Sequence, residues 1–269
     1  MKILVTGVLG VIGSKLEEIL KIRGHEVFGV DLYHTSRVYG HGLGKVKSDD
    51  YFRCDIGEFR QIEQVIEYVK PDLIYNCAAE FGRWNGENFY EKVWKSNVIG
   101  MKHIIRLQEK HGFKLVHCSS SEVYGDYEGV MYEDVLNETP IIQMNDYAMS
   151  KRVNEMQIHS SRSQFGTNSV MVRFFNTYGP GEWYHPFRSV NCLFTYQEHT
   201  IENLAELLVK YTKADASLVD YREHGEVLTT KHKHVDASKS VRDLDHKNTV
   251  SLEEGVWETV QWMKEHYRL

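Results

Sequence analysis

Short β-rich runs alternate with longer helical patterns through the first half of this 269-residue chain. The runs are KILVT, HEVFGVD, DLIYNCAA and FKLVHCSS, and helical patterns cover residues 11–23, 58–69 and 90–110. Repeated strand and helix units predict an α/β fold with a doubly wound parallel sheet, covered by helices on both faces. Because such sheets bind ligands at the carboxyl ends of their strands, we expect the functional residues in the loops that follow.

The pattern changes after Phe165. The elements expected beyond it are one strand, an irregular stretch rich in glycine, proline and aromatic residues, and two helices, at residues 169–175, 176–188, 201–212 and 252–266. We therefore predict a sheet domain over residues 1–168, to which the later strand returns. A smaller mixed α/β cap that binds substrate is expected over residues 176–269.

Composition argues against several kinds of partner. The net charge of -6 gives no general attraction to nucleic acid. No apolar run approaches the roughly 20 residues of a membrane helix, and glycines interrupt the apolar start, so neither a membrane segment nor a signal peptide is predicted. The four cysteines, at positions 54, 77, 118 and 192, form no CxxC pair, which favours reduced thiols and a cytoplasmic location. The KHKH stretch at 231–234 is interpreted as an exposed basic segment, and no metal is predicted.

A glycine triplet follows the first predicted strand. Gly7, Gly10 and Gly13 have the spacing GxxGxxG at the start of a predicted helix. These glycines let the backbone turn tightly and approach a pyrophosphate, whose charge is stabilised by free N–H groups and the positive end of the helix dipole. The position of the triplet predicts a Rossmann-type dinucleotide site.

A carboxylate at the end of the second predicted strand favours NAD over NADP. Asp31 lies roughly 20 residues beyond the glycine turn, where it would accept hydrogen bonds from the adenosine ribose. It would also repel the 2′-phosphate of NADP, although Arg37 could reach such a phosphate. Asp55, after the third strand, and the small residues Ala78 and Ala79, after the fourth, complete the expected groove for adenine and its ribose.

A tyrosine, a lysine and a serine run form the candidate catalytic set. In YAMSK, Tyr147 and Lys151 are four residues apart, so both project from one face of a helix. An ammonium near a phenol favours the phenolate, which can act as a base. The fifth strand ends in CSSSEVYG, so a hydroxyl such as Ser120 can bind the substrate oxygen that Tyr147 deprotonates.

These motifs occur in one order along the chain, together with Asn154 and Glu155, RFFNTYGPG and the closing SLEEGVWETVQWM. In that order they resemble the NAD-dependent nucleotide-sugar epimerase/dehydratase family of extended short-chain dehydrogenases. The resemblance runs from residue 1 to about residue 189 and resumes near residue 199. It implies NAD as cofactor, a nucleotide sugar as substrate and a homodimer.

Carried onto this chain, the resemblance makes Tyr147 the base, Ser120 its hydroxyl partner and Lys151 the residue that holds the nicotinamide ribose. Glu122 is a fourth catalytic candidate. The expected cofactor-binding residues are Gly7, Gly10, Val11, Ile12, Gly13, Asp31, Leu32, Asp55, Ile56, Ala78, Ala79, Asn97, Cys118, Tyr147, Lys151 and Phe174. The expected substrate-binding residues are Glu80, Ser119, Ser121, Asn176 and Arg188.

The resemblance implies oxidation of a ring carbon, usually C4, to a keto sugar before the hydride returns. We expect epimerisation first and elimination of water, of the 4,6 or 5,6 type, second. Dehydratases carry an Asp-Glu pair after the serine, whereas this chain has Ser121 and Glu122. Three further alternatives stay open: a UDP-glucuronate-type decarboxylase, an NADP-dependent keto-sugar reductase and a non-catalytic NAD-binding regulator. Decarboxylases rely on a further arginine, for which we identify no counterpart in this chain. Asp31 argues against the NADP-dependent reductase, and the intact catalytic set argues against the regulator.

One segment departs from the family pattern. Relatives have several tens of residues between the positions of Phe194 and His199, where this chain passes almost at once between two predicted helices. Either the chain lacks part of its nucleotide pocket or residues are missing near 195–198, and the family-like flanks favour the second explanation. UDP-, GDP-, CDP- and dTDP-linked sugars all stay open as substrates.

Overall fold

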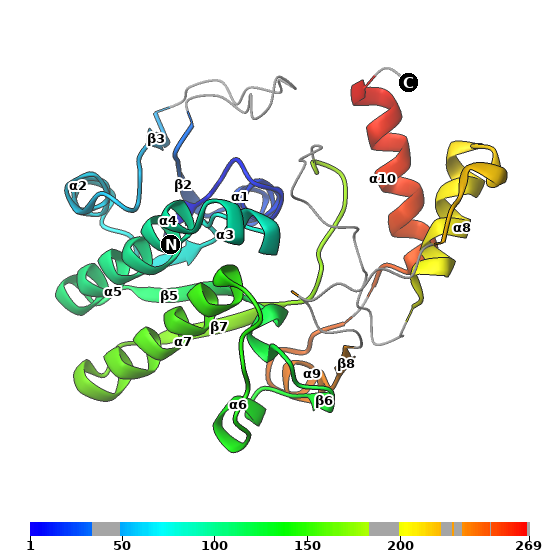
Figure 1. Ribbon diagram of the computed structural model, residues 1–269. Coiled ribbons are helices and arrows are strands. Elements are labelled where there is room, and N and C mark those ends of the chain that lie inside the picture. The colour runs from blue at the N-terminus through cyan, green and yellow to red at the C-terminus, as the bar shows by residue number, and fades with distance from the viewer. Residues whose placement is uncertain (34–48, 183–198, 222–227, 229–232, 248, 268–269) are drawn as a thin grey trace. The chain divides into compact units, whose positions relative to one another are not determined.

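The computed structural model describes residues 1–33, 49–182, 199–221, 228, 233–247 and 249–267 (Figure 1). Contacts divide these residues into two units. The first takes the described parts of Met1–Val123 and Asn145–Phe174. The second takes Tyr124–Met144, Phe175–Glu182 and the described residues from 199 onward. Residues 124–144 thus group with the C-terminal part, whereas the sequence pattern predicted them with the sheet; the boundary at 168 itself stays a prediction.

A six-stranded parallel sheet forms the centre of the first unit, with strand order β3-β2-β1-β4-β5-β7. The strands are β1 (Lys2–Thr6), β2 (Glu26–Asp31), β3 (Tyr51–Arg53), β4 (Leu73–Asn76), β5 (Lys114–Ser120) and β7 (Ser169–Phe174). The order reverses between β1 and β4, which is the switch point where such sheets bind ligands. The predicted doubly wound parallel sheet is therefore confirmed, and β7 returns to it beside β5 as expected.

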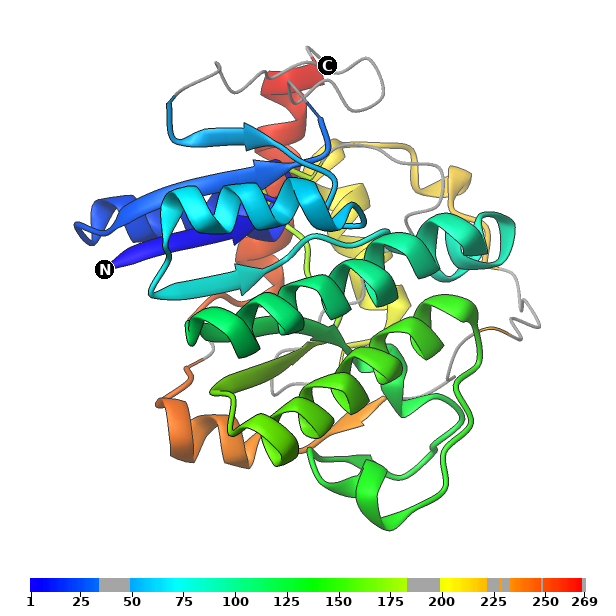
Figure 2. The same cartoon turned by 90° about the vertical axis from the view of Figure 1, so that its left-hand side faces the viewer.

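Helices cover both faces of this sheet. They are α1 (Val11–Ile22), α2 (Phe59–Val69), α3 (Arg83–Asn88), α4 (Tyr90–Val93), a π-helical segment (Trp94–Ile99), α5 (Gly100–His111) and α7 (Asp146–Phe165). Figure 2 shows α2, α5 and α7 in front of the sheet. The side chains of α1 belong to a separate cluster on the other face.

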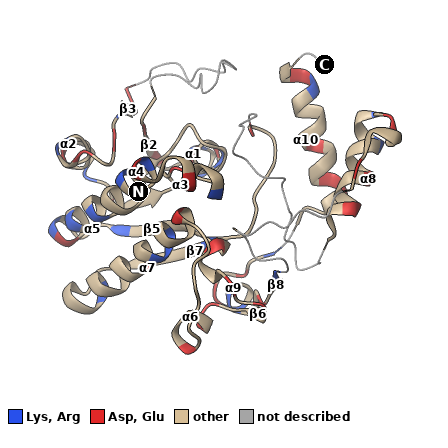
Figure 3. Ribbon diagram, viewed as in Figure 1, with Lys and Arg blue, Asp and Glu red and all other residues tan. Residues whose placement is uncertain are grey.

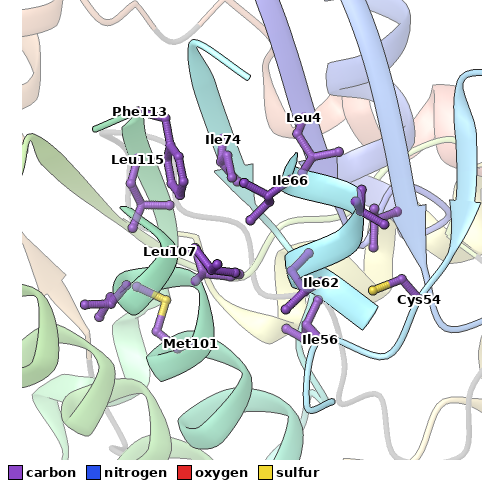
Figure 4. Close-up of a cluster of buried hydrophobic side chains, with 14 of the residues drawn as sticks. Leu4, Cys54, Ile56, Ile62, Ile66, Ile74, Met101, Leu107, Phe113 and Leu115 are labelled. Atoms are coloured by element: carbon purple, nitrogen blue, oxygen red, sulfur yellow. The ribbon is translucent and has the colours of Figure 1, made fainter. Parts of the chain in front are cut away.

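Alternation along the strands divides the core between the two faces. Leu4 points to the face covered by α2 and α5, where it joins a large buried cluster (Figure 4). Its neighbours Ile3 and Val5 point to the α1 face, where Leu20 packs against them. Full burial of such a side chain contributes about 1.5–3 kcal/mol, so these two clusters fix the strands that carry the site.

The outer surfaces of the helices carry charges of both signs. Figure 3 shows Lys, Arg and acidic residues along α5. There the Nζ of Lys110 lies 2.8 Å from an oxygen of Glu67 and 3.6 Å from one of Glu63, which joins α5 to α2. Solvent screens exposed ion pairs of this kind, so they add little to the stability that the core provides.

The second unit contains a two-stranded parallel ribbon and a helix pair. The ribbon is formed by β6 (Val130–Met131) and β8 (His234–Val235), and the short helices are α6 (Val135–Glu138) and α9 (Ser238–Leu244). Two longer helices, α8 (Ile201–Thr212) and α10 (Leu252–Tyr267), lie where the sequence predicted them. They pack through a cluster that includes Leu204, Val256 and Val260.

Candidate active site

The glycine turn after β1 leaves no room for side chains at two of its three glycines. Gly7 has a φ of 69°, in the left-handed region that favours glycine. A Cβ at Gly7 would lie 2.6 Å from the backbone nitrogen of Ala78, and one at Gly13 would lie 2.2 Å from the carbonyl oxygen of Gly7. These two glycines therefore let the turn pack against the chain after β4.

Gly10, the remaining glycine of the turn, has more open surroundings. Among the described residues, apart from the chain neighbours of Gly10 and the backbone of its own helix, a Cβ at Gly10 would meet one atom within 4 Å, the carbonyl oxygen of Gly7 at 3.3 Å. Gly10 precedes α1 without a side-chain cap, so the helix begins at Val11 and Ile12 with uncapped N–H groups. An open backbone surface next to the positive end of a helix fits a pyrophosphate, and these residues therefore fit a dinucleotide.

Asp31, the last residue of β2, is tied to the same turn. Its Oδ2 accepts a hydrogen bond from the backbone nitrogen of Leu9 at 2.9 Å, and its Oδ1 accepts one from Tyr33 at 3.4 Å. Burial raises the pKa of Asp31, while these backbone donors oppose the shift. The carboxylate thus shapes the glycine turn, in addition to its predicted role toward a ribose. Leu32 is exposed beside it, and Arg37 lies outside the described residues.

The residues predicted after β3 hold their loop against the helices. The Oδ1 of Asp55 accepts from the nitrogen of Gly57 at 2.8 Å, and its Oδ2 lies 3.1 Å from the Nζ of Lys95. Ile56 is buried, and a Cβ on Gly100 would lie only 2.7 Å from its side chain. Their assignment to the adenosine groove stays a prediction.

The loop after β4 is held by one buried asparagine in the π-helical segment. Asn97 accepts a hydrogen bond from the nitrogen of Glu80 at 2.9 Å. Its amide nitrogen donates to the carbonyl of Glu80 and to Ser150 Oγ, both at 3.0 Å. The structure therefore joins a predicted cofactor residue, a predicted substrate residue and α7. Ala78 and Ala79 lie in this same loop, immediately before Glu80.

The first two turns of α7 carry the predicted base and lysine. Asn145 caps the helix by accepting a hydrogen bond from the nitrogen of Ala148 at 2.7 Å. Lys151 is buried, and its Nζ donates to the carbonyl oxygen of Cys118 at 2.8 Å. The same nitrogen lies 5.8 Å from the ring centre of Tyr147. Burial lowers the pKa of Lys151 to about 8, so its ammonium still carries charge at neutral pH.

The three serines at the end of β5 have different surroundings, since successive side chains of a strand alternate. Ser119 donates to the Oε1 of Glu155 at 2.7 Å, whereas the Oγ of Ser120 accepts from the nitrogen of Glu122 at 3.2 Å. Ser121 is buried in the turn that follows. The hydroxyl of Ser119 is thus already bonded to a carboxylate, and its assignment to substrate stays a prediction.

Sequence reasoning missed the ion pair beneath these serines. Glu155 is fully buried, and the Nε and Nη2 of Arg173 each donate to it at 2.9 Å. The sequence signal was present: Glu155 follows Lys151 by one helical turn, and Arg173 begins RFFN. Pairing them, however, required knowing that α7 covers β7.

A buried histidine continues the polar network below Lys151. The Nδ1 of His117 lies 3.2 Å from the amide nitrogen of Asn76, and its Nε2 lies 3.4 Å from the amide of Asn154. Burial, together with the charge of Lys151, lowers the pKa of His117 well below its ordinary value. The histidine is therefore neutral and accepts the hydrogen bond of Asn76 through Nδ1.

The remaining predicted residues belong to the chain after β5. Phe174, the last residue of β7, is paired in register with Ser120. Asn176 follows two residues later and groups with the second unit. Arg188 and the segment near 195–198 lie outside the described residues, so nothing in the structure bears on those predictions.

The sheet, the glycine turn and the lysine beside a tyrosine define a dinucleotide-dependent enzyme of the short-chain dehydrogenase type. The model of the NAD dependent epimerase/dehydratase family matches residues 3–244, and the chain belongs to this family. NAD is accordingly its cofactor, and the protein is an enzyme of the nucleotide-sugar epimerase/dehydratase class. These predictions from the sequence are confirmed.

Two relatives illustrate the range of reactions. UDP-glucuronate 4-epimerase of Thermodesulfobacterium geofontis is 25% identical over 321 aligned positions, which cover 99% of this chain and 97% of the relative. UDP-glucuronic acid decarboxylase 1 of Xenopus tropicalis is 32% identical over 183 positions, covering 66% of this chain and 42% of the relative. Since the first alignment has more positions than the 269 residues of the chain, that epimerase contains residues without a counterpart here.

Solved structures of epimerases share the fold. UDP-glucose 4-epimerase of Thermotoga maritima, solved with UDP-glucose, gives a TM-score of 0.85 at 21% identity and covers 99% of this chain and 100% of that one. UDP-glucuronic acid 4-epimerase of Bacillus cereus, solved with UDP-glucuronic acid and NAD, gives 0.81 at 21% identity and covers 98% and 99%.

The described part of the chain has neither a membrane-spanning helix nor a cluster of metal-ligating side chains. Every helix in this part falls short of the length and hydrophobicity needed to span a bilayer. Within the same residues, His, Cys, Asp and Glu side chains form no group of three or more that could hold a metal ion.

Proposed function

We propose that the protein epimerises a nucleotide-linked sugar by way of a transient 4-keto intermediate. The observation that carries the proposal is the position of Lys151, whose buried Nζ donates to the Cys118 carbonyl and lies 5.8 Å from the ring centre of Tyr147. A cation held there stabilises a phenolate at the end of β5, where the substrate hydroxyl is expected. The epimerase from T. geofontis, which aligns with 99% of this chain, supports the same reaction.

Each residue has a separate task in this reaction. The glycine turn and Lys151 would hold NAD, which would supply a reversible hydride acceptor for the ring carbon. Tyr147 takes the proton of the C4 hydroxyl and gives it back, and Ser120 hydrogen-bonds the same oxygen. Lys151 supplies the charge that favours the phenolate. Because the keto carbon can be reduced on either face, inversion at C4 needs no acid or base beyond these residues.

Elimination of water is the second candidate, because of the position of Glu122. Its backbone nitrogen donates to Ser120 Oγ at 3.2 Å, and its Oε2 lies 3.5 Å from the amide nitrogen of Asn145, the cap of α7. A carboxylate held between Ser120 and the first turn of α7 fits removal of a proton beside the keto group. Elimination also needs an acid to expel the leaving oxygen, and Ser121 stands where dehydratases carry one. Epimerisation therefore ranks first.

The substrate class is proposed from the relatives. Both reported relatives and both reported structures carry UDP-sugar names or ligands, so UDP-sugars are the first substrates to test. The homodimer is a separate proposal, and the mass of the purified protein by light scattering tests it directly.

The reaction can be identified by incubating the protein and NAD with UDP-, GDP-, CDP- and dTDP-sugars in deuterated water. NMR of the products then locates any deuterium. A C4 epimer without carbon-bound deuterium is expected. Deuterium at C5 with loss of water would instead establish elimination, and loss of carbon dioxide from UDP-glucuronate would establish decarboxylation.

Variants connect the reaction to the site. Tyr147→Phe removes the proton acceptor, and we expect turnover to fall by about 10²- to 10⁴-fold while NAD still binds. Tyr68→Phe is the matched control, since Tyr68 is 72% exposed on α2. Full activity in Tyr147→Phe, or no conversion of any nucleotide sugar by wild-type protein that binds NAD, would contradict the proposal.

A further inference from the structure

Two cysteines that are far apart in the sequence meet at the carboxyl ends of β4 and β5. Asn76 and His117 are paired in register, so Cys77 and Cys118 are the next residues along neighbouring parallel strands. Their sulfur atoms lie 3.4 Å apart, with a hydrogen bond between the thiols. Cys118 is buried, whereas Cys77 is partly exposed.

The backbone geometry suits a covalent bond between them. Adjacent strands lie about 4.7–4.9 Å apart, which falls within the roughly 4.4–6.8 Å that separates Cα atoms across a disulfide. The two sulfur atoms need to approach by little more than 1 Å to reach the bond length of about 2.05 Å. Such a movement is within the reach of side-chain rotation and a small strand adjustment.

The electrostatics of the pair favour one thiolate. The hydrogen bond between the two sulfur atoms and the charge of Lys151 lower the pKa of Cys118, although burial opposes them. The same hydrogen bond and burial raise the pKa of Cys77. Cys54 differs, because burial raises its pKa to about 12 and it stays a thiol. Since the thiolate is the nucleophile, Cys118 is the reactive member and Cys77 is in place to resolve it.

We propose that Cys77 and Cys118 form a reversible disulfide when the protein meets a hydroperoxide. The Cys118 thiolate attacks one peroxide oxygen, which breaks the O–O bond, gives a sulfenic acid and releases hydroxide. The Cys77 sulfur then attacks the Cys118 sulfur and expels hydroxide, while the Cys77 proton goes to water. Two thiols lose two electrons, and one hydrogen peroxide becomes two waters.

The disulfide changes the site through one hydrogen bond. The carbonyl of Cys118 is the acceptor that holds the Nζ of Lys151, and Ser120 follows two residues later. Drawing the end of β5 toward β4 moves both positions, so the oxidised protein turns over more slowly. This consequence for activity rests on the proposed function, whereas formation of the disulfide does not.

The test treats the full chain with hydrogen peroxide, blocks remaining thiols with N-ethylmaleimide and maps the peptides by mass spectrometry. We expect a Cys77–Cys118 linked peptide, two hydrogens lighter than the two thiol peptides together, which dithiothreitol cleaves. Cys192→Ser is the control that keeps the pair. Alkylation of both cysteines after peroxide, or irreversible oxidation of Cys118 without the linked peptide, would overturn the proposal.

Cys77→Ala separates this mechanism from general oxidative damage. We expect this variant to keep turnover when reduced. In excess peroxide a second peroxide molecule oxidises the unresolved sulfenic acid of Cys118 to the sulfinic acid, which dithiothreitol does not reduce, so the variant loses activity without recovery while wild type recovers. If dithiothreitol restores the variant as fully as wild type, Cys77 does not resolve Cys118 and the proposal fails. A linked peptide in a protein without sugar turnover would instead refute the proposed function and leave the disulfide standing.

Discussion

Replacing Glu155 by glutamine tests whether the buried ion pair below the serines stabilises the fold. The carboxylate is fully buried and accepts two hydrogen bonds from Arg173, each 2.9 Å long, and one from Ser119 at 2.7 Å. Charge-assisted hydrogen bonds contribute about 1.5–3 kcal/mol each. Removing one partner of a buried ion pair costs about 3–5 kcal/mol, since the other charge is left uncompensated. We therefore expect Glu155→Gln to lower the free energy of unfolding by about 3–5 kcal/mol.

Urea unfolding followed by circular dichroism measures this loss. With a denaturant slope of about 3 kcal/mol/M, the midpoint of Glu155→Gln should fall by about 1–1.7 M. Glu253→Gln is the matched control, because Glu253 pairs with Lys210 at 2.6 Å but both side chains are 59% exposed. We expect the control to unfold at nearly the same urea concentration as wild type, because solvent screens an exposed ion pair.

A double variant separates the ion pair from simple loss of packing. Replacing both Glu155 and Arg173 by methionine removes both charges. The double variant should therefore lose less free energy of unfolding than Glu155→Met and Arg173→Met lose when their separate losses are added. A Glu155→Gln protein within about 1 kcal/mol of wild type, or a double variant that shows plain additivity, would refute the reasoning.

Lys151, His117 and Gly10 give three further predictions. Because the pKa of Lys151 is lowered to about 8, kcat/KM should decline above about pH 8 as the ammonium loses its proton. Lys151→Arg should move that decline to higher pH, because arginine keeps its charge. An unchanged decline in the arginine variant would argue against Lys151 as its cause. The pKa of His117 in the folded chain lies well below 6.5. Below pH 6.5 the unfolded state therefore binds a proton at this histidine that the folded state does not bind. The free energy of unfolding should fall by up to about 1.4 kcal/mol per pH unit in this range. Urea unfolding at several pH values should show a shallower fall in His117→Phe, and an equal slope would contradict the assignment. Gly10→Ala should lower the affinity for NAD, measured by calorimetry, with little loss of stability. Gly13→Ala, whose Cβ would lie 2.2 Å from the carbonyl oxygen of Gly7, should lower both the NAD affinity and the stability. Wild-type NAD affinity in Gly10→Ala would place the pyrophosphate elsewhere.

The sequence by itself determined the elements and most of the motif positions. Strand runs, helical periodicity and glycine turns are local properties, so the parallel sheet, the turn at Gly7 and the helix that carries Tyr147 and Lys151 could all be predicted. The four-residue spacing of Tyr147 and Lys151 is also sufficient to put both on one helical face.

Only the tertiary structure decided which distant residues meet. The bond from Lys151 to Cys118 and the contact between Cys77 and Cys118 depend on how α7, β4 and β5 are packed and registered. The pairing of Glu155 with Arg173 depends likewise on α7 covering β7, and the sequence shows only two charged letters 18 residues apart. Register and packing follow from the summed burial of many side chains on both faces of the sheet, which no short motif encodes.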